Sequence, residues 1–305
     1  MGWAARARRR PPTLATIIGK DIKPSPETAG PDILYHYTDW VALRGILTSR
    51  TFRATAHQHT NDPDELTSAD SEIVTTLAEM RASTHGIATQ ALDRLIAEFD
   101  DLHIGRKSTV YIISFSDTKD GEEHWRAYGR DGHGVCLGIR VDSEQQINPG
   151  LATGLINVSY DPAEWRHVIQ QTVEPILSLA SRADVALEPH NFELTLGTLS
   201  ALASYSEVRA KNSTPWAFEN ESRFIAVPHA GSRPRVQISE IGKPYVSVVV
   251  RKRSGRIALP ELIIGPNNDP DDGLKKAEAV LKEAGYVIAA QDYPKILLSS
   301  VPRWL

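Results

Sequence analysis

The stretch from Phe218 to Val227 constrains the fold most, because its charged residues run directly into an uninterrupted apolar strand. Successive side chains of a strand point to opposite faces, so Glu219, Glu221 and Arg223 are expected on one face. Two carboxylates and a guanidinium are costly on a buried face. The wall of a cleft would account for these charges. A solvated edge strand whose charges prevent aggregation is the alternative, and this stretch alone favours it; the polar and aromatic residues upstream shift the balance toward the cleft.

Other segments predict the elements that surround this strand. Runs of β-forming residues predict strands at 33–38, from Phe52, and at 110–116, 135–139, 245–250 and 261–266. Helical spacing of apolar residues predicts helices at 40–47, 73–80, 92–99 and 274–284. The helices near Ile73 and Leu92 are expected to cover the sheet. The fold class is therefore α+β, with a mixed, mostly antiparallel central sheet and flanking helices.

The expected domain organisation is a short arm followed by one domain. Residues 1–31 hold Arg6, Arg8, Arg9, Arg10 and several prolines, which predicts a flexible basic arm. Residues 32–305 are expected to form a single domain. Within it, residues 162–210 predict two amphipathic helices, and no linker brackets them, so a helical insertion is expected.

Composition excludes several classes of protein. The net charge of −4 and the pI of about 6.2 give no overall basic field for nucleic acid or for an anionic membrane. Cys136 is the single cysteine, which excludes an intramolecular disulfide framework and suits a reducing cytoplasm. It lies within an apolar strand, so an inert core residue is expected. No apolar run reaches the roughly 18 residues of a membrane-spanning helix, so no membrane contact is expected.

The polar loop from His57 to Glu65 contains residue types that can bind a metal. His57 and His59 could share a metal with Asp62 or Asp64, but two histidines without a third spaced ligand are a weak signal. The Asn-Asp-Pro sequence in this loop favours a turn. No metal is therefore expected.

Candidate ligand-binding residues lie at the ends of two predicted strands and in the segment after the second. His36, Tyr37 and Thr38 end the first strand, where substrate contacts gather. Further along the chain, the candidates are Ser114, Ser116, Trp125, Arg126 and Tyr128. Aromatic and polar groups between two central strands are typical of the rim of a ligand site. The alternative, that Trp125 and Tyr128 fill the core beside the loop, is equally favoured for Trp125.

Seven short motifs occur in order along the chain. They are Leu34-Tyr35-His36-Tyr37-Thr38, Gly45-Ile46-Leu47, Asn61-Asp62-Pro63-Asp64-Glu65, Ser114-Phe115-Ser116, Trp125-Arg126-Ala127-Tyr128-Gly129, Phe218-x-x-Glu221-x-Arg223 and Ile263-Ile264-Gly265-Pro266. Together they resemble a bacterial family known as domain of unknown function 2971. The likeness covers about residues 33–270 and brings no activity with it.

The order of these motifs also resembles the ADP-ribosyltransferase fold. This resemblance implies that NAD is the substrate, that His36 holds its ribose, and that Glu221 or Glu219 is catalytic. The middle position is filled either by the serine pair or by Tyr128. The His-x-Thr sequence and the later Ile-Leu pair are similar to the DNA-targeting branch, which implies a nucleic-acid acceptor; a protein acceptor stays open.

The implied chemistry needs no metal. Cleavage of the nicotinamide–ribose bond passes through an oxocarbenium-like state, which a carboxylate on the 2′-hydroxyl stabilises. Arg223 or Arg126 would offer the pyrophosphate a fork of donors. For this chemistry, His36 must meet Glu219 and Glu221 across one pocket. The alternatives are a metal-dependent nuclease or a glycosidase using both glutamates, and a non-enzymatic binding module, such as a sensor in a toxin or phage-defence system.

Overall fold

The computed structural model describes most of the chain as two compact units. The residues described are 33–62, 64, 66–99, 109–140, 148–181, 189–229, 231–250, 255–287, 290 and 293–304. The expected basic arm, residues 1–31, lies outside them. The helical unit holds the described residues of Asp64–Thr109 and Ser159–Lys211. The sheet unit holds those of Lys23–Pro63, Val110–Val158 and Asn212–Leu305.

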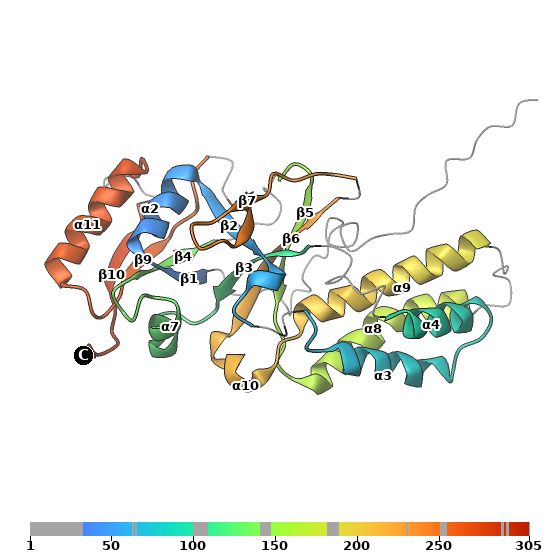
Figure 1. The fold of residues 1–305 in the computed structure, drawn as a ribbon. Coiled ribbons are helices and arrows are strands. Elements are labelled where there is room, and N and C mark those ends of the chain that lie inside the picture. Colours follow the sequence, from blue (N-terminus) through green and yellow to red (C-terminus); the bar gives the residue numbers. More distant parts are fainter. Residues whose placement is uncertain are drawn as a thin grey trace, which may run out of the picture. The chain divides into compact units, whose positions relative to one another are not determined.

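The sheet unit is built on a ten-stranded, open sheet (Figure 1). Its strands are β1 (Leu34–Thr38), β2 (Thr51–Ala56), β3 (Tyr111–Ser116), β4 (Val135–Ile139), β5 (Leu151–Asn157), β6 (Glu221–Pro228), β7 (Gln237–Ile238), β8 (Pro244–Val249), β9 (Glu261–Ile264) and β10 (Lys295–Leu298). The main order is β10-β9-β4-β1-β3-β2-β8-β7, and β6 joins β3 to β5. Among the described strands, β9 and β10 pair in parallel and the other pairs are antiparallel. The prediction of a mixed, mostly antiparallel sheet is confirmed.

Strand β3 is central, as its continuous apolar sequence predicts. The whole of β3 pairs with β6 along one edge, with Ser114 opposite Arg223 and Ser116 opposite Glu221. Parts of β1 and β2 pair along the other edge, where Tyr35 lies opposite Ser116. This pairing brings the opening strand, the serine strand and the glutamate strand into adjacent positions.

Helices cover the two faces of the sheet near β1, β4 and β9 (Figure 1). Helices α2 (Trp40–Ser49) and α11 (Pro270–Glu283) bury Leu43, Leu47 and Leu281 in a core with the side chains of one sheet face. Each begins at an aspartate whose carboxylate accepts backbone N–H groups, Asp39 and Asp269. The short helix α7 (Glu122–Ala127) packs Trp125 on the other face, against Tyr35 and Tyr37.

The helical unit contains four long helices with a core of their own. They are α3 (Asp70–Arg81), α4 (Ile87–Ala97), α8 (Pro162–Ala180) and α9 (Pro189–Arg209). The prediction that the helices near Ile73 and Leu92 cover the sheet is wrong, because these residues share a core with Ile169 of α8 and Leu199 of α9. Helical periodicity marks a buried face but does not identify its partner.

No helix in the described ranges combines the length and the apolar composition needed to cross a bilayer.

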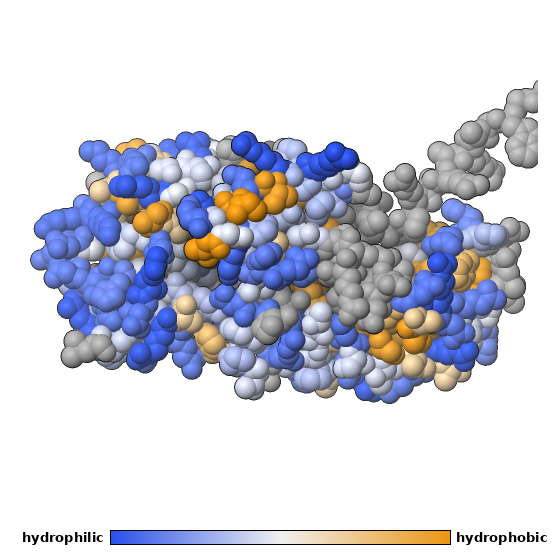
Figure 2. All heavy atoms as spheres, in the orientation of Figure 1, coloured by the Kyte–Doolittle hydropathy of each residue, from blue (hydrophilic) through white to orange (hydrophobic). Residues whose placement is uncertain are grey.

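The open edge of the sheet unit at β7 carries a small apolar patch, visible in Figure 2. Val236, Ile238 and Ile241 contribute to it, with exposed fractions of 46%, 63% and 77%. These side chains lie within and beside a two-residue strand, the shortest in the described sheet.

Candidate functional site

The glutamate strand begins later than its alternation predicts. Ala217–Glu219 forms a 3₁₀ turn, and Asn220 adopts a left-handed conformation with φ of 40° before β6 begins at Glu221. The prediction that Glu219 shares a strand face with Glu221 and Arg223 is therefore wrong. The edge-strand alternative is also wrong, because β6 pairs on both sides, with β3 and β5.

Glu221, Ser114 and Arg223 form a polar cluster on the face of β3 and β6 that also carries Tyr37. The Ser114 hydroxyl donates to Glu221 Oε1 at 2.5 Å, and Arg223 Nε lies 3.2 Å from Glu221 Oε2. Glu221 is 3% exposed and Arg223 is fully buried, so the guanidinium compensates a carboxylate that water scarcely reaches. Ser114 is exposed although it lies in a central strand. Its hydroxyl is therefore the accessible end of a buried charge pair.

Glu219 lies in a second cluster, where the turn before β6 meets α7. The Tyr128 hydroxyl donates to Glu219 Oε1. The rings of Tyr128 and Phe218 stack with centroids 6.5 Å apart, and the His124 ring meets Phe218 edge-on at 5.3 Å. Tyr128 and Phe218 are both half-buried. Because Glu219 precedes the strand by two residues, this aromatic pair lies at the end of β6 that carries Glu221.

Ser116 and His124 fix the turn before β6 by contacting the backbone carbonyl of Glu219. The Ser116 hydroxyl donates to Glu219 O at 2.5 Å, accepts Thr118 N at 2.9 Å and lies 2.9 Å from His124 Nε2. Burial lowers the pKa of His124, and the hydrogen bond to Glu219 O only partly offsets this effect. Ser116 and His124 are buried, so they position the turn. The prediction that Ser116 contacts a ligand is wrong.

His36 lies on the opposite face of the sheet from Glu221. Its ring meets Phe52 at 5.3 Å and Phe115 at 5.7 Å, whereas Glu221 contacts the side chain of Ser114. Ser114 and Phe115 are consecutive strand residues, so their side chains point to opposite faces. The prediction that the imidazole and the glutamates meet across one pocket is therefore wrong. Burial lowers the pKa of His36, whose Nδ1 lies 3.0 Å from Ser114 O.

The other two candidates on β1, Tyr37 and Thr38, are not placed to contact a ligand at Glu221. Thr38 lies two residues after His36, on the same face and thus away from Glu221. Tyr37 shares the face of Ser114, but it is buried, and its hydroxyl donates to Thr118 O and accepts from Gly121 N, both at 2.9 Å. Burial raises its pKa. Tyr37 therefore anchors the loop after β3 instead of meeting a ligand.

The predictions that Trp125, Arg126 and Arg223 contact a ligand also disagree with the structure. Trp125 is fully buried and its Nε1 donates to Asp120 Oδ1 at 2.7 Å, so the core interpretation holds and the ligand contact is wrong. Buried Arg223 cannot present a fork to a pyrophosphate. Arg126 is exposed, but its guanidinium pairs with Glu122 at 2.9 Å and lies 4.4 Å above the Trp304 ring. Cys136 is buried, as predicted.

The histidine-rich loop has a local role. His57 begins a 3₁₀ turn, is buried, and its Nδ1 accepts from Val110 N at 3.2 Å. Within the ranges that the structure describes, no three or more histidine, cysteine, aspartate or glutamate side chains gather as a metal-binding group.

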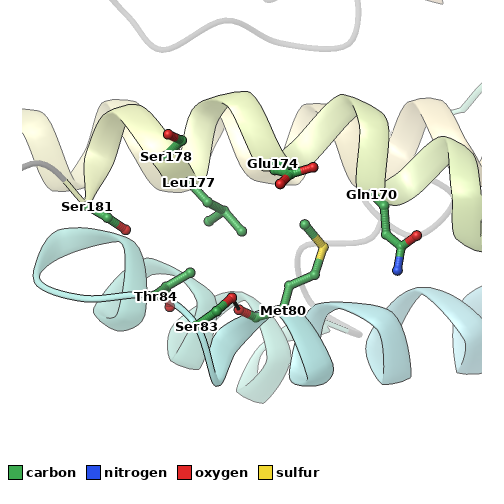
Figure 3. Close-up of a pocket in the computed structure, with 8 residues that line it drawn as sticks. All are labelled: Met80, Ser83, Thr84, Gln170, Glu174, Leu177, Ser178 and Ser181. Atoms are coloured by element: carbon green, nitrogen blue, oxygen red, sulfur yellow. Dashed lines mark hydrogen bonds between the residues drawn. The ribbon is translucent and has the colours of Figure 1, made fainter.

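A cavity of about 480 Å³ lies in the helical unit, and none of the predicted site residues lines it. Figure 3 shows Met80, Glu174 and Leu177 pointing into the space between the end of α3 and α8. Its other lining groups are Ser83, Thr84, Gln170, Ser178 and Ser181. Among the described residues, the lining offers hydroxyls and one carboxylate but no cation to hold a phosphate.

The sequence patterns did not identify His124, Asp120 or the stacking of the Phe218 ring on Tyr128 as parts of the site. His124 directly precedes Trp125, and Asp120 lies in the loop after β3. Polar residues in a loop after a central strand were the available signal. Their burial and bonding depend on contacts distant in sequence, which no local pattern specifies.

Comparison with known proteins gives one match. No curated protein and no solved structure matches this chain significantly. The likeness to the ADP-ribosyltransferase fold stays a prediction. A family model described as "Protein of unknown function (DUF2971)" matches residues 124–224, a range that includes His124, Tyr128, Glu219 and Glu221 but not His36 or Ser114. Over residues 124–224, the resemblance to the DUF2971 family is confirmed.

Proposed function

We propose that this chain is an NAD-consuming enzyme, similar to ADP-ribosyltransferases, in which Glu221 is the catalytic carboxylate. One observation carries the proposal: an exposed serine in a central strand donates to a buried, charge-compensated glutamate. A carboxylate with fixed partners needs no reorganisation when positive charge develops beside it. Ser114 is exposed, so a ribose hydroxyl can approach the serine end of this pair and reach Glu221 Oε1 by displacing or sharing the serine hydrogen bond.

The proposed step is cleavage of the bond between nicotinamide and ribose. As the bond breaks, its electron pair leaves with nicotinamide and the ribose carbon becomes oxocarbenium-like. The Glu221 carboxylate accepts a hydrogen bond from the ribose 2′-hydroxyl, and this bond strengthens as the ring becomes positive. Each carboxylate oxygen has two acceptor positions, so Oε1 can hold Ser114 and the ribose together. Water or an acceptor then attacks the same carbon.

Tyr128 and Phe218 would supply a planar wall for the nicotinamide. Their rings are stacked and half-buried, and Tyr128 is fixed by its bond to Glu219. Aromatic faces bind a flat heterocycle through offset stacking. The convergence of His36 with the glutamates, on which the sequence-based version of this chemistry depended, is absent because His36 lies on the other sheet face. The proposal therefore gives His36 no role and rests on Glu221, Ser114 and the aromatic pair alone. The acceptor of the ADP-ribose group is proposed to be a nucleic acid or a protein, in a cytoplasmic toxin or phage-defence setting.

A fluorescent NAD analogue tests the proposal. We expect the purified protein to release the fluorescent product in the presence of mixed protein and nucleic-acid acceptors. Glu221→Gln should reduce the rate by at least about 100-fold, which corresponds to about 2.7 kcal/mol of transition-state stabilisation. His36→Asn is the matched control on the opposite face and should keep most of the rate. Intact analogue with every acceptor, or equal losses in both variants, would contradict the proposal.

The second candidate is a binding module that holds a nucleotide without cleaving it. The burial of Glu221 and Arg223 favours it, because such a pair also serves as an internal fixed charge. In that case NAD or a related nucleotide raises the melting temperature, and the ligand is recovered intact. A nuclease or glycosidase with Glu219 and Glu221 as a strand-borne pair has less support, because Glu219 lies in the turn and bonds to Tyr128.

A further inference from the structure

The C-terminal segment from Ser299 to Trp304 contacts both ends of α7. It follows β10, and Ser299 N donates to Ile264 O at 2.9 Å, which attaches the segment to β9. Helix α7 has only six residues, and its N-cap, Gly121, offers no side-chain hydrogen bond. Helices this short are not stable alone, so contacts outside the helix must fix its position.

Asp120 makes the first tie between the C-terminal segment and α7. Its carboxylate accepts from Ser299 Oγ at 2.5 Å, from Ser300 N at 2.6 Å and from Ser300 Oγ at 2.8 Å. The same carboxylate accepts from Trp125 Nε1 at 2.7 Å, inside α7. Burial acts to raise the pKa of Asp120, but these hydrogen bonds outweigh it and lower the pKa. One charged group therefore joins the start of the segment to the buried indole of the helix.

Trp304 makes the second tie. The Arg126 guanidinium of α7 lies 4.4 Å from the centre of the Trp304 ring, a cation–π distance. The indole Nε1 donates to Asp131 Oδ1 at 3.0 Å, and Trp304 N donates to Asn267 Oδ1 at 3.1 Å. Asp131 and Asn267 therefore fix the position of Trp304, and the face of its ring contacts Arg126 of α7.

The other side of α7 carries the groups that meet the turn before β6. Tyr128 follows the helix and bonds to Glu219, while His124 lies within it and contacts Phe218 and Ser116. We propose that the C-terminal segment is a positioning element, in which Trp304 acts through Arg126 and α7 to hold Tyr128 against Glu219. The segment therefore sets the geometry of the candidate site without touching its ligand.

Hydrogen exchange followed by mass spectrometry tests this inference on the full-length chain. Tyr128 N and Gly129 N bond within α7, to His124 O at 2.8 Å and Trp125 O at 3.1 Å, and report its opening. We expect Trp304→Ala to speed exchange at these amides by at least about 10-fold, the effect of about 1.4 kcal/mol. Peptides covering 217–221 should exchange faster as well.

Two further variants separate positioning from general destabilisation. Trp304→Phe keeps a ring under Arg126 and should restore most of the protection. Tyr245→Ala is the control: the Arg53 guanidinium lies 4.9 Å from the centre of the Tyr245 ring, and the Tyr245 hydroxyl donates to Gln237 Oε1 at 3.3 Å. This pair lies on β2, β7 and β8, at the opposite end of the strand order from β9, so the variant should leave exchange at α7 unchanged. Equal exchange at α7 in Trp304→Ala and Tyr245→Ala would overturn the inference, as would loosening of α7 with unchanged exchange at 217–221.

A second readout rests on the proposed function. If the protein cleaves the NAD analogue, Trp304→Ala should lower kcat by about 10-fold and Trp304→Phe should recover it. Faster exchange at residues 217–221 in Trp304→Ala together with an unchanged kcat would contradict the claim that the C-terminal segment positions the site. Should the unmodified protein leave the analogue intact, the proposed function fails, while the exchange experiment still decides the role of the C-terminal segment.

Discussion

Replacement of Arg223 by methionine should destabilise the sheet unit strongly. Arg223 is fully buried, and its Nε lies 3.2 Å from the carboxylate of Glu221, whose side chain is 1% exposed. Removing one partner of a buried ion pair costs about 3–5 kcal/mol, because the remaining charge loses an interaction that water cannot replace. Domains are stable by only about 5–15 kcal/mol, so the change removes a large share of the stability.

Urea denaturation, followed through hydrogen exchange of the β3 and β6 amides, measures this cost in the sheet unit alone. With a denaturant slope of about 2 kcal/mol per molar, the midpoint should fall by about 1.5–2.5 M. Arg44→Met is the control, because Arg44 pairs with Glu283 on the surface and both side chains are about half exposed. A surface pair contributes at most about 1 kcal/mol, so its midpoint should fall by at most about 0.5 M.

The double variant Arg223→Met with Glu221→Gln isolates the charge. Since it also removes the buried carboxylate that has lost the guanidinium, we expect it to recover at least about half of the lost stability. A midpoint for Arg223→Met within about 0.5 M of the unmodified protein would refute the reasoning, because the guanidinium would then not compensate Glu221. A double variant no more stable than Arg223→Met would show that lost packing, and not charge, causes the effect.

Two further predictions concern the surroundings of the site. Burial lowers the pKa of His124, so the folded protein resists its protonation; its stabilising contribution is complete above the usual value of 6.5 and is lost as the pH falls below it. The free energy of unfolding should therefore fall from pH 7 to pH 5, and less steeply in His124→Gln; an unchanged slope would contradict this. Gly134→Ala should cost several kcal/mol because its Cβ would overlap Thr38 O and approach Gly129 O to 2.8 Å, whereas Gly45→Ala, in open space on α2, should stabilise by about 0.5–1 kcal/mol. Equal melting temperatures for these two glycine variants would contradict the packing described.

Strand positions were readable from the sequence where the strands are central. β3 and β4 are continuous apolar runs, which fully buried strands require. β5 lacks this signal, because Thr153 and Gly154 interrupt it, and β10 at the sheet edge holds partly exposed residues. Edge and interrupted strands depend on pairing with distant segments, which local patterns do not encode.

The candidate site was only half predictable for a geometric reason. Alternation shows that neighbouring strand residues face opposite ways, but not which face of β1 matches which face of β6; that choice depends on register across β3. A shift of β1 by one residue would move the His36 side chain to the sheet face that carries Ser114. Likewise, the left-handed Asn220 ends the alternation before it reaches Glu219.

A crystal structure of the Glu221→Gln variant with NAD tests the central claim most directly. The substitution removes the catalytic charge but keeps the size of the side chain and an amide oxygen that can accept from Arg223 Nε, so the folded site and the ligand should persist. We expect the nicotinamide ribose within hydrogen-bond reach of Ser114 and of the substituted side chain, with the nicotinamide against Tyr128 and Phe218. NAD bound on the face of His36, or no NAD at millimolar concentration, would contradict the claim that the Ser114–Glu221 cluster is the ligand site.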